Sequence, residues 1–320
     1  KTGAGKSTLI QLLERMYDVE NGTLLLDGNP IKDISIKSIR SQIAYASQEP
    51  LLFSDTIYQN LLLANTSATK EAIEQAAYYS VAVFIGSFIE APSRAMMNIL
   101  QPLTSKTLNE ENHVEVASLY KKSSINLLLI SGLFFVLINA NVNQLFNLLP
   151  QQYAGGELVV FMISFVKMYN GFLGNNGAII NNSKYYKITL PYSFMMAISV
   201  YALNTLFYDQ LNMGTDGLAL ATLIVIFFAN TGKLLFVKSK FAMTPFTDKS
   251  WRMIGIIAIL YVIFNFWDFP LHDIYLWKIP IHQTINIILK SILITGIYFY
   301  LVIKLQISDE ILRLSKRFQK

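Results

Sequence analysis

The pattern of apolar and polar positions changes near Ala77. Residues 71–77 read EAIEQAA, with the spacing of an amphipathic, soluble helix. From Tyr78 the sequence reads YYSVAVFIGSFIEA, and apolar stretches follow it through most of the chain. A membrane helix needs about 20 mostly apolar residues. Candidate spans of this length lie at about 79–104, 123–149, 158–182, 188–208, 214–236, 252–269 and 281–305.

This pattern predicts a mainly α, polytopic membrane helical bundle of about seven spans, preceded by a small incomplete α/β segment. The expected parts are residues 1–77, the membrane portion 78–308 and a basic tail 309–320. Composition agrees, because 53% of residues are apolar and 15% are charged, against about 25% charged in soluble domains. The chain has no cysteine, which excludes disulfides and thiolate metal sites.

Basic residues in the links between spans predict the orientation. Lysine and arginine accumulate on the cytoplasmic side of membrane proteins. They fill the first, third and fifth links and the tail, whereas the even links hold only Lys278. We therefore expect a multi-pass protein of the inner (plasma) membrane with a cytoplasmic C-terminus. The first span would then run inward, and residues 1–77 would lie outside the cytoplasm, where ATP is scarce.

The chain opens with KTGAGKST, the second half of the P-loop pattern G-x-x-x-x-G-K-[ST]. Glycines let backbone N–H groups surround phosphates, and a following helix, expected from Ser7 to about Tyr17, directs its positive end at the same anion. Lys6 would reach the β- and γ-phosphates, and the Ser7 hydroxyl would bind Mg²⁺. The candidate nucleotide-binding residues here are Gly3, Ala4, Gly5, Lys6, Ser7 and Thr8.

Residues 1–77 resemble the ATP-binding domain of an ABC exporter. The resemblance rests on the P-loop run, on YDVENGTLLLDG and on IAYASQEPLLFSDTIYQN. It implies ATP and Mg²⁺ as cofactors, with Gln48 as the Q-loop glutamine that contacts Mg²⁺. The pattern also predicts strands at Thr23–Leu26 and Ser41–Ser47, with a turn at Asp27-Gly28.

Other motifs of such a domain do not follow. The sequence after residue 77 contains no LSGGQ signature, no apolar run ending in Asp-Glu and no histidine in a switch context. We therefore expect that this segment touches phosphate at most and does not hydrolyse ATP. Because the sequence starts inside the motif, we also expect a truncated reading frame.

The membrane portion resembles the polysaccharide-flippase branch of the multidrug/oligosaccharidyl-lipid/polysaccharide exporter superfamily. The residues that carry the resemblance are SVAVFIGSFIEAPSRAMMNILQPLTSKTLNEEN and ASLYKKSSINLLLISGLFFVLI. It implies the last seven of fourteen helices, with the first lobe absent. The implied partners are the lipid bilayer and a lipid-linked oligosaccharide, with no cofactor for this part and no nucleic acid.

Four polar residues inside the spans are candidates for a substrate cavity. Ionisable groups at membrane depth are costly and usually face a cavity or a partner. Glu90 and Arg94 share a helix face, and they either line a cavity or form a structural pair beside Pro92. Lys167 either meets a substrate phosphate or a carboxylate or carbonyl within the bundle, and Asn170 follows it.

Two functional hypotheses follow from these residues. The first is a chimera near Ala77 that joins an ABC exporter fragment to half of a flippase for lipid-linked oligosaccharides. The alternative is a genuine ATP-driven ABC-type transporter with an unusual membrane domain. The missing motifs and the outward placement of residues 1–77 favour the first.

Overall fold

The computed structural model describes residues 6–19, 21–42, 59, 68–150, 153, 155–276 and 279–318. The chain divides into two compact units, Lys1–Thr56 and Ile57–Lys320, and each is described by itself. The predicted junction near Ala77 lies within the second unit, inside the single helix α4, Lys70–Ser87. Because that junction concerns the origin of the two segments, it stays a prediction.

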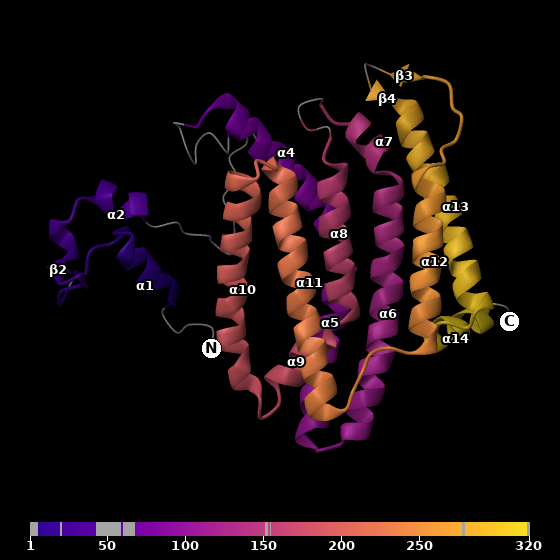
Figure 1. Ribbon diagram of the computed structural model, residues 1–320, viewed down its shortest axis with the longest axis horizontal. Coiled ribbons are helices and arrows are strands. Elements are labelled where there is room, and N and C mark those ends of the chain that lie inside the picture. The colour runs from indigo at the N-terminus through magenta and orange to yellow at the C-terminus, as the bar shows by residue number, and fades with distance from the viewer. Residues whose placement is uncertain are drawn as a thin grey trace. The chain divides into compact units, whose positions relative to one another are not determined.

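The first unit is a small α/β element (Figure 1). Its hairpin turns at Asp27 and Gly28, whose φ angles of 51° and 81° suit a two-residue hairpin turn of the Asp-Gly type. The predicted first strand and its turn are thus confirmed, although the strand is shorter than expected. The described elements are α1 Lys6–Leu13, β1 Leu25–Leu26, β2 Asn29–Pro30, the 3₁₀ turn η1 Ile31–Asp33 and α2 Ile36–Gln42.

Two predictions for this unit were wrong in part. The helix expected to reach Tyr17 ends at Leu13, because Arg15 takes a left-handed φ of 49° and the Met16 N–H donates to the Gln11 carbonyl at 2.9 Å. This bond closes the helix end as in a Schellman motif. The strand predicted at Ser41–Ser47 begins inside helix α2, and its residues from 43 on lie outside the described part of the chain.

The second unit consists mainly of helices that run alongside one another (Figure 1). Hydrogen-bonding residues start several of them: Thr69 caps α4, Asn112 caps α6 and Thr247 forms a capping box with Ser250 at α12. The remaining elements are α5 Glu90–Asn109, α6 His113–Ala140, α7 Val142–Asn147, α8 Glu157–Phe172, α9 Asn175–Asn181, η3 Tyr186–Ile188, α10 Thr189–Asn204, the π turn η4 Thr205–Gln210, α11 Gly214–Phe241, α12 Asp248–Asn265, β3 Tyr275–Leu276, β4 Ile279–Pro280, α13 Ile281–Lys304 and α14 Asp309–Phe318.

The mainly α fold class is confirmed, but the number of spans is smaller than predicted. Within the described residues four straight segments are long and apolar enough to cross a membrane, and two bent helix pairs raise the number to six. The predicted span 252–269 is not among them. Its helix α12 has 18 residues and carries Asp248, Lys249 and Arg252 near its start, which leaves too short an uncharged stretch. The four straight segments are His113–Ala140, Tyr186–Gln210, Gly214–Phe241 and Ile281–Lys304.

Two of the predicted spans are broken helices. The first, predicted at 79–104, consists of α4 and α5, which meet at an angle of 50°. The third, predicted at 158–182, consists of α8 and α9, which meet at 51°. Pro92 lies in the first turn of α5, where its missing N–H leaves no helical hydrogen bond unmade. The break comes just before Glu90, two residues ahead of Pro92.

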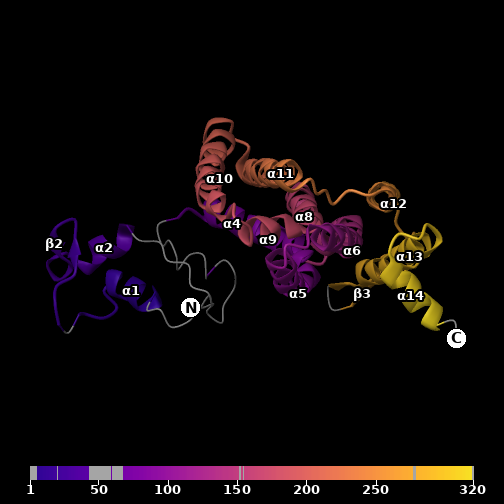
Figure 2. The ribbon, with the colours of Figure 1, turned by 90° about the horizontal axis from the view of Figure 1, so that it is seen from below.

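Helix α6 lies at the centre of the largest apolar cluster. It packs against α5, α8 and α12, and the end-on view in Figure 2 shows α6 between α8 on one side and α12 and α13 on the other. Gly132 permits the close approach of α12, because a Cβ there would lie 2.2 Å from the Ile257 Cδ1. The Tyr298 hydroxyl of α13 donates to the Leu129 carbonyl of α6 at 2.5 Å. Small residues and interhelical hydrogen bonds of this kind are typical of packing between membrane helices.

One lysine of α13 lies deep in the unit. Lys290 is 1% exposed. Its Nζ lies 2.7 Å from the Asp268 Oδ1, which also accepts a hydrogen bond from the Gln144 Nε2 at 2.6 Å. The loop after α12 therefore supplies a counter-ion to α13, which the linear sequence does not reveal.

Candidate functional site

The predicted nucleotide site falls largely outside the described residues. Gly3, Ala4, Gly5 and Gln48 lie there entirely. Lys6, Ser7 and Thr8 form the first turn of α1, although the described structure does not include their side chains. The helix that was predicted to follow the phosphate loop is therefore present. The roles of these residues toward ATP and Mg²⁺, including Ser7 and Gln48 as Mg²⁺ ligands, stay predictions.

The four candidates from the membrane spans lie together. Glu90 and Arg94 come from α5, and Lys167 and Asn170 come from α8. All four line one cavity of about 410 Å³. The remaining residues that line it are Ser93, Met97, Asn98, Gln101, Gly171 and Gly174.

Glu90 is the centre of this cluster. Its Oε1 lies 2.8 Å from the Lys167 Nζ, and its Oε2 accepts a hydrogen bond from the Arg94 NH2 at 3.0 Å. Of the partners considered for Lys167, the structure thus shows a carboxylate. Two cations face one anion, so the cluster keeps a net positive charge inside a cavity with otherwise uncharged walls. Such a site attracts an anion, most strongly at Lys167, because the Lys167 side chain is 25% exposed whereas that of Arg94 is 75% exposed.

Further polar side chains complete the cavity. Asn170 accepts a hydrogen bond from the Asn230 Nδ2 of α11 at 3.0 Å, which orients its amide. The Ser93 hydroxyl is buried and has no hydrogen-bond partner among the described residues. An unpaired buried hydroxyl at a cavity wall is a ready donor or acceptor for a bound molecule. Sequence reasoning missed both Ser93 and Asn230, although an asparagine in an apolar span was a signal for the second.

The two helix breaks lie close to this cavity. Glu90 begins α5 just after the first break, and Gly174 belongs to the second break, between α8 and α9. Beside the cavity, the Thr104 hydroxyl of α5 donates to the Asn175 Oδ1 of α9 at 3.1 Å, which joins the two broken spans. In secondary transporters, substrate sites near the membrane centre are typically formed by discontinuous helices. The geometry is therefore that of a polar cavity with a net cationic character beside two helix breaks.

Comparison with known proteins assigns the N-terminal segment. Residues 1–117 match the family model of the ABC transporter family. This match covers less than half of the 320 residues, so it identifies an ABC transporter-type ATP-binding segment and does not assign the whole chain. It extends past the predicted junction and into α6. ATP and Mg²⁺ binding is what this family implies for the segment.

Particular relatives are proteins of Staphylococcus aureus named as multidrug export ATP-binding/permease proteins. Those of strains NCTC 8325 and COL are 49% identical over 76 residues, and that of the bovine strain RF122 is 47% identical over the same length. The aligned part is 24% of this chain and 13% of each relative. The chain thus spans only a small part of the proteins it matches. No solved structure matches the chain.

Proposed function

We propose that the membrane portion, residues 78–308, here called the membrane unit, derives from a flippase for lipid-linked oligosaccharides. Its polar cavity would receive the pyrophosphate of the carrier lipid. The observation that supports this proposal most directly is the cluster of Glu90, Arg94 and Lys167 at the helix breaks. Pyrophosphate is a compact polyanion, and lysine and arginine are its usual protein partners. Asn170 and Ser93 are placed to hydrogen-bond the bridging oxygens or the first sugar.

The cluster also suggests how binding would be regulated. Glu90 is one-fifth exposed and neutralises part of the charge of both cations. An entering pyrophosphate would compete with Glu90 for the Lys167 ammonium. This exchange would keep Lys167 paired with an anion in both states.

Binding of a short-chain polyprenyl pyrophosphate to the full chain in detergent tests this proposal. We expect Lys167→Met to weaken binding about tenfold or more, because a hydrogen bond to a charged group contributes about 1.5–3 kcal/mol. Glu90→Gln should strengthen binding, because it releases both cations. Lys106→Gln is the control. Lys106 is an exposed lysine of α5, the helix of Glu90 and Arg94, and it pairs with Glu110 at 3.9 Å.

Three results would contradict the proposal. One is equal binding of the pyrophosphate and the corresponding polyprenyl alcohol. The second is a loss in Lys106→Gln as large as that in Lys167→Met. The third is weaker binding by Glu90→Gln, which would mean that the carboxylate contacts the ligand or maintains the cavity. Far-UV circular dichroism of each variant separates loss of fold from loss of affinity.

We further propose that the nucleotide-binding segment and the membrane unit have separate origins and that the segment does not drive transport. The compositional change near Ala77 and the limit of the relatives' alignment to 76 residues support this. DNA reads from the source that span codons 70–85 test the junction directly. Labelling of residue 6 as Lys6→Cys in intact cells tests the placement: protection from an impermeant thiol reagent until the membrane is opened would overturn the outward orientation.

The second candidate function is an ATP-driven ABC-type transporter, and the family match through residue 117 favours it. An ATPase assay of the purified chain separates the two candidates. Sustained, Mg²⁺-dependent turnover that Lys6→Ala abolishes would establish the ATP-driven transporter. Absence of turnover in a chain that binds the polyprenyl pyrophosphate would favour the flippase-derived unit.

A further inference from the structure

Lys233 lies inside a membrane span without a carboxylate partner. It belongs to α11, and its Nζ lies 5.5 Å from the ring centroid of Tyr192 of α10. Lys167 and Lys290, by contrast, each pair with a carboxylate at less than 3 Å. Among the described residues Lys233 has no ion pair. Because an apolar helix holds this cation without an anionic partner, an anion supplied from outside the chain would stabilise it.

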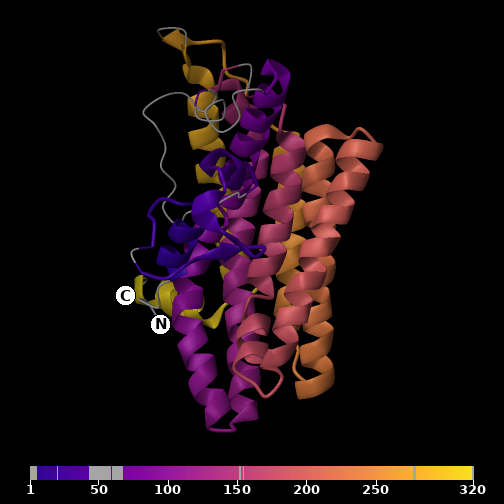
Figure 3. The same cartoon turned by 90° about the vertical axis from the view of Figure 1, so that its left-hand side faces the viewer.

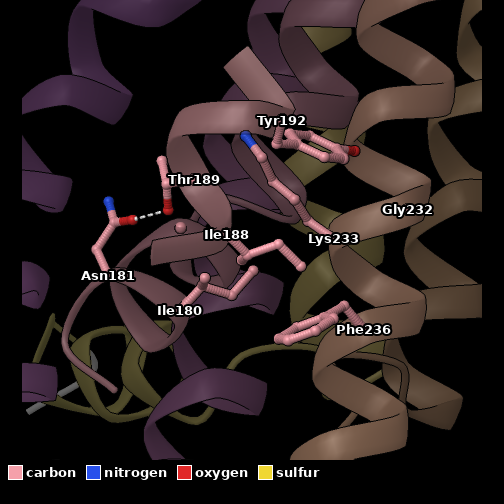
Figure 4. A pocket seen from close by; sticks show the side chains of 9 residues that line it. Ile180, Asn181, Ile188, Thr189, Tyr192, Gly232, Lys233 and Phe236 are labelled. Carbon is pink, nitrogen blue, oxygen red and sulfur yellow. Dashed lines mark hydrogen bonds between the residues drawn. The ribbon is translucent and has the colours of Figure 1, made fainter. Parts of the chain in front are cut away.

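A cavity opens beside Lys233 (Figure 4). Asn181, Thr189 and Lys233 supply its polar groups, and the Thr189 hydroxyl donates to the Asn181 Oδ1 at 2.7 Å. The remaining walls are mostly apolar, and the volume is about 140 Å³. In Figure 4 the amine of Lys233 extends past the Tyr192 ring, which lies against Gly232. This small cavity, here called the mouth, is mostly apolar, has the Lys233 side chain in its wall and is too small for a large solute.

A second, larger and similarly apolar cavity lies next to the first. It has a volume of about 460 Å³ and lies between α10 and α11. Both cavities share Tyr192 and Gly232, so the tyrosine lies between the mouth and this second cavity, here called the slot. The Tyr192 hydroxyl donates to the Ala229 carbonyl, which holds the ring in this place. Met195, Met196, Ser199, Ala202, Leu203, Ile224, Val225 and Phe228 line the rest of the slot.

The dimensions of the two cavities fit one lipid chain. From Lys233 to Ile224 the slot follows nine residues of α11, or about 13 Å at 1.5 Å per residue. The hydrocarbon part of one leaflet is about 15 Å thick, half of the ~30 Å core. Figures 1 and 3 show α10 and α11 side by side along this length, so the slot runs along the helix axes.

The charges around the mouth fit an anionic head group. Lys238 and Lys240 follow Lys233 on α11, and Lys184 and Lys187 lie just before α10. The two groups meet at the same end of the unit, because the amines of Lys184 and Lys240 both lie within 6 Å of the Tyr185 ring centroid. Basic residues at one end of a span attract anionic lipids of the adjacent leaflet.

We propose that the groove between α10 and α11 binds one anionic phospholipid of the surrounding bilayer, with its phosphate at Lys233 and one acyl chain in the slot beyond Tyr192. This site is separate from the cavity at Glu90 and Lys167 and does not depend on the function proposed for that cavity. The bound lipid supplies the counter-ion that Lys233 lacks and covers apolar side chains of α10, which has no fully buried residue of its own.

Native mass spectrometry of the full chain in detergent tests this proposal. The probes are phosphatidylglycerol and phosphatidylcholine with identical acyl chains. We expect the wild type to bind the anionic lipid about tenfold more tightly, because a charge-assisted hydrogen bond has this effect. Lys233→Met should abolish the preference. Lys238→Gln, which removes a cation from the same end but lies outside both cavities, should keep it. Ser199→Phe should weaken both lipids, because it fills the slot.

Several outcomes would overturn the proposal. They are a wild type without preference, equal losses in Lys233→Met and Lys238→Gln, and unchanged lipid binding in Ser199→Phe. Displacement of the lipid by millimolar inorganic phosphate would mean that the mouth binds a free anion instead of a lipid. Circular dichroism confirms that each variant is folded.

Discussion

The ion pair between Lys290 and Asp268 makes an asymmetric prediction about stability. The two partners differ in burial: the Lys290 side chain is 1% exposed, whereas that of Asp268 is 48% exposed. Removal of either partner leaves the other without its ion pair. The cost depends on how well solvent can reach the charge that remains.

We expect Asp268→Asn to be the more harmful change. It leaves the buried Lys290 ammonium without an anion, and breaking a buried pair costs about 3–5 kcal/mol. Because Asp268 is half exposed, solvent screens part of the original attraction, so we expect about 2–3 kcal/mol. Lys290→Met keeps the volume of the side chain and leaves a carboxylate that water and Gln144 can solvate, so we expect about 1 kcal/mol.

The double variant Asp268→Asn/Lys290→Met removes both charges and should resemble Lys290→Met alone. The expected coupling energy is therefore about 2–3 kcal/mol, well above the error of such cycles. Unfolding by detergent titration, followed by far-UV circular dichroism, gives the free energies of unfolding. Trp267 is a local probe, because its ring centroid lies 4.7 Å from that of Phe269 beside the pair.

A Lys290→Met variant that is less stable than Asp268→Asn would refute this reasoning, because the buried charge would then not govern the cost. Costs below about 0.5 kcal/mol for both variants would likewise mean that the pair is not formed in the folded protein. Lys249→Gln is a suitable comparison, since Lys249 pairs with Asp309 at 2.8 Å on an exposed surface and should cost about 0–1 kcal/mol.

Three further predictions concern other parts of the second unit. Gly132→Ala should lower the free energy of unfolding by about 1–3 kcal/mol in the same titration, because its Cβ would clash with Ile257. Gly255→Ala, which has open space around it, should leave that free energy unchanged or raise it by up to about 1 kcal/mol. Equal effects of the two variants would contradict the packing of α6 against α12. Thr104→Val should cost about 1–3 kcal/mol, because the buried Asn175 loses its donor, whereas Ser80→Ala on an exposed helix face should change stability little. The hydrogen bond and charge of Lys249 lower the pKa of Asp309, so this pair stabilises the start of α14 above the ordinary pKa of aspartate and is lost as pH falls through the lowered folded value. The protection of the α14 amides, measured as their exchange rate relative to the intrinsic rate at the same pH, should therefore fall below about pH 4, and Lys249→Gln should remove that change.

The sequence predicted the class of each part with good accuracy. The P-loop residues around Lys6 indicated an ABC-type segment, and the family match assigns it to residues 1–117. The apolar runs after Tyr78 predicted a helical membrane bundle, because a helix that hides its own backbone polar groups is the structure such runs adopt in lipid. The hairpin at Asp27-Gly28 was also predictable, since its turn depends on local backbone preferences alone.

The cavity was predicted only in part. Glu90, Arg94, Lys167 and Asn170 stood out because ionisable or amide groups are rare in apolar spans. Their chemical role stays a prediction, as does the flippase origin. The sequence could not show that Glu90 holds both cations, because Lys167 lies on another helix.

By itself the sequence determined the nucleotide-binding motif, the helical membrane class and the turn of the hairpin, because these depend on short stretches of chain. The tertiary structure decided where spans break, that Lys290 is buried against Asp268, and that Lys233 is left without a carboxylate. These depend on which helices lie side by side, and hydropathy, which treats each span separately, does not contain that information.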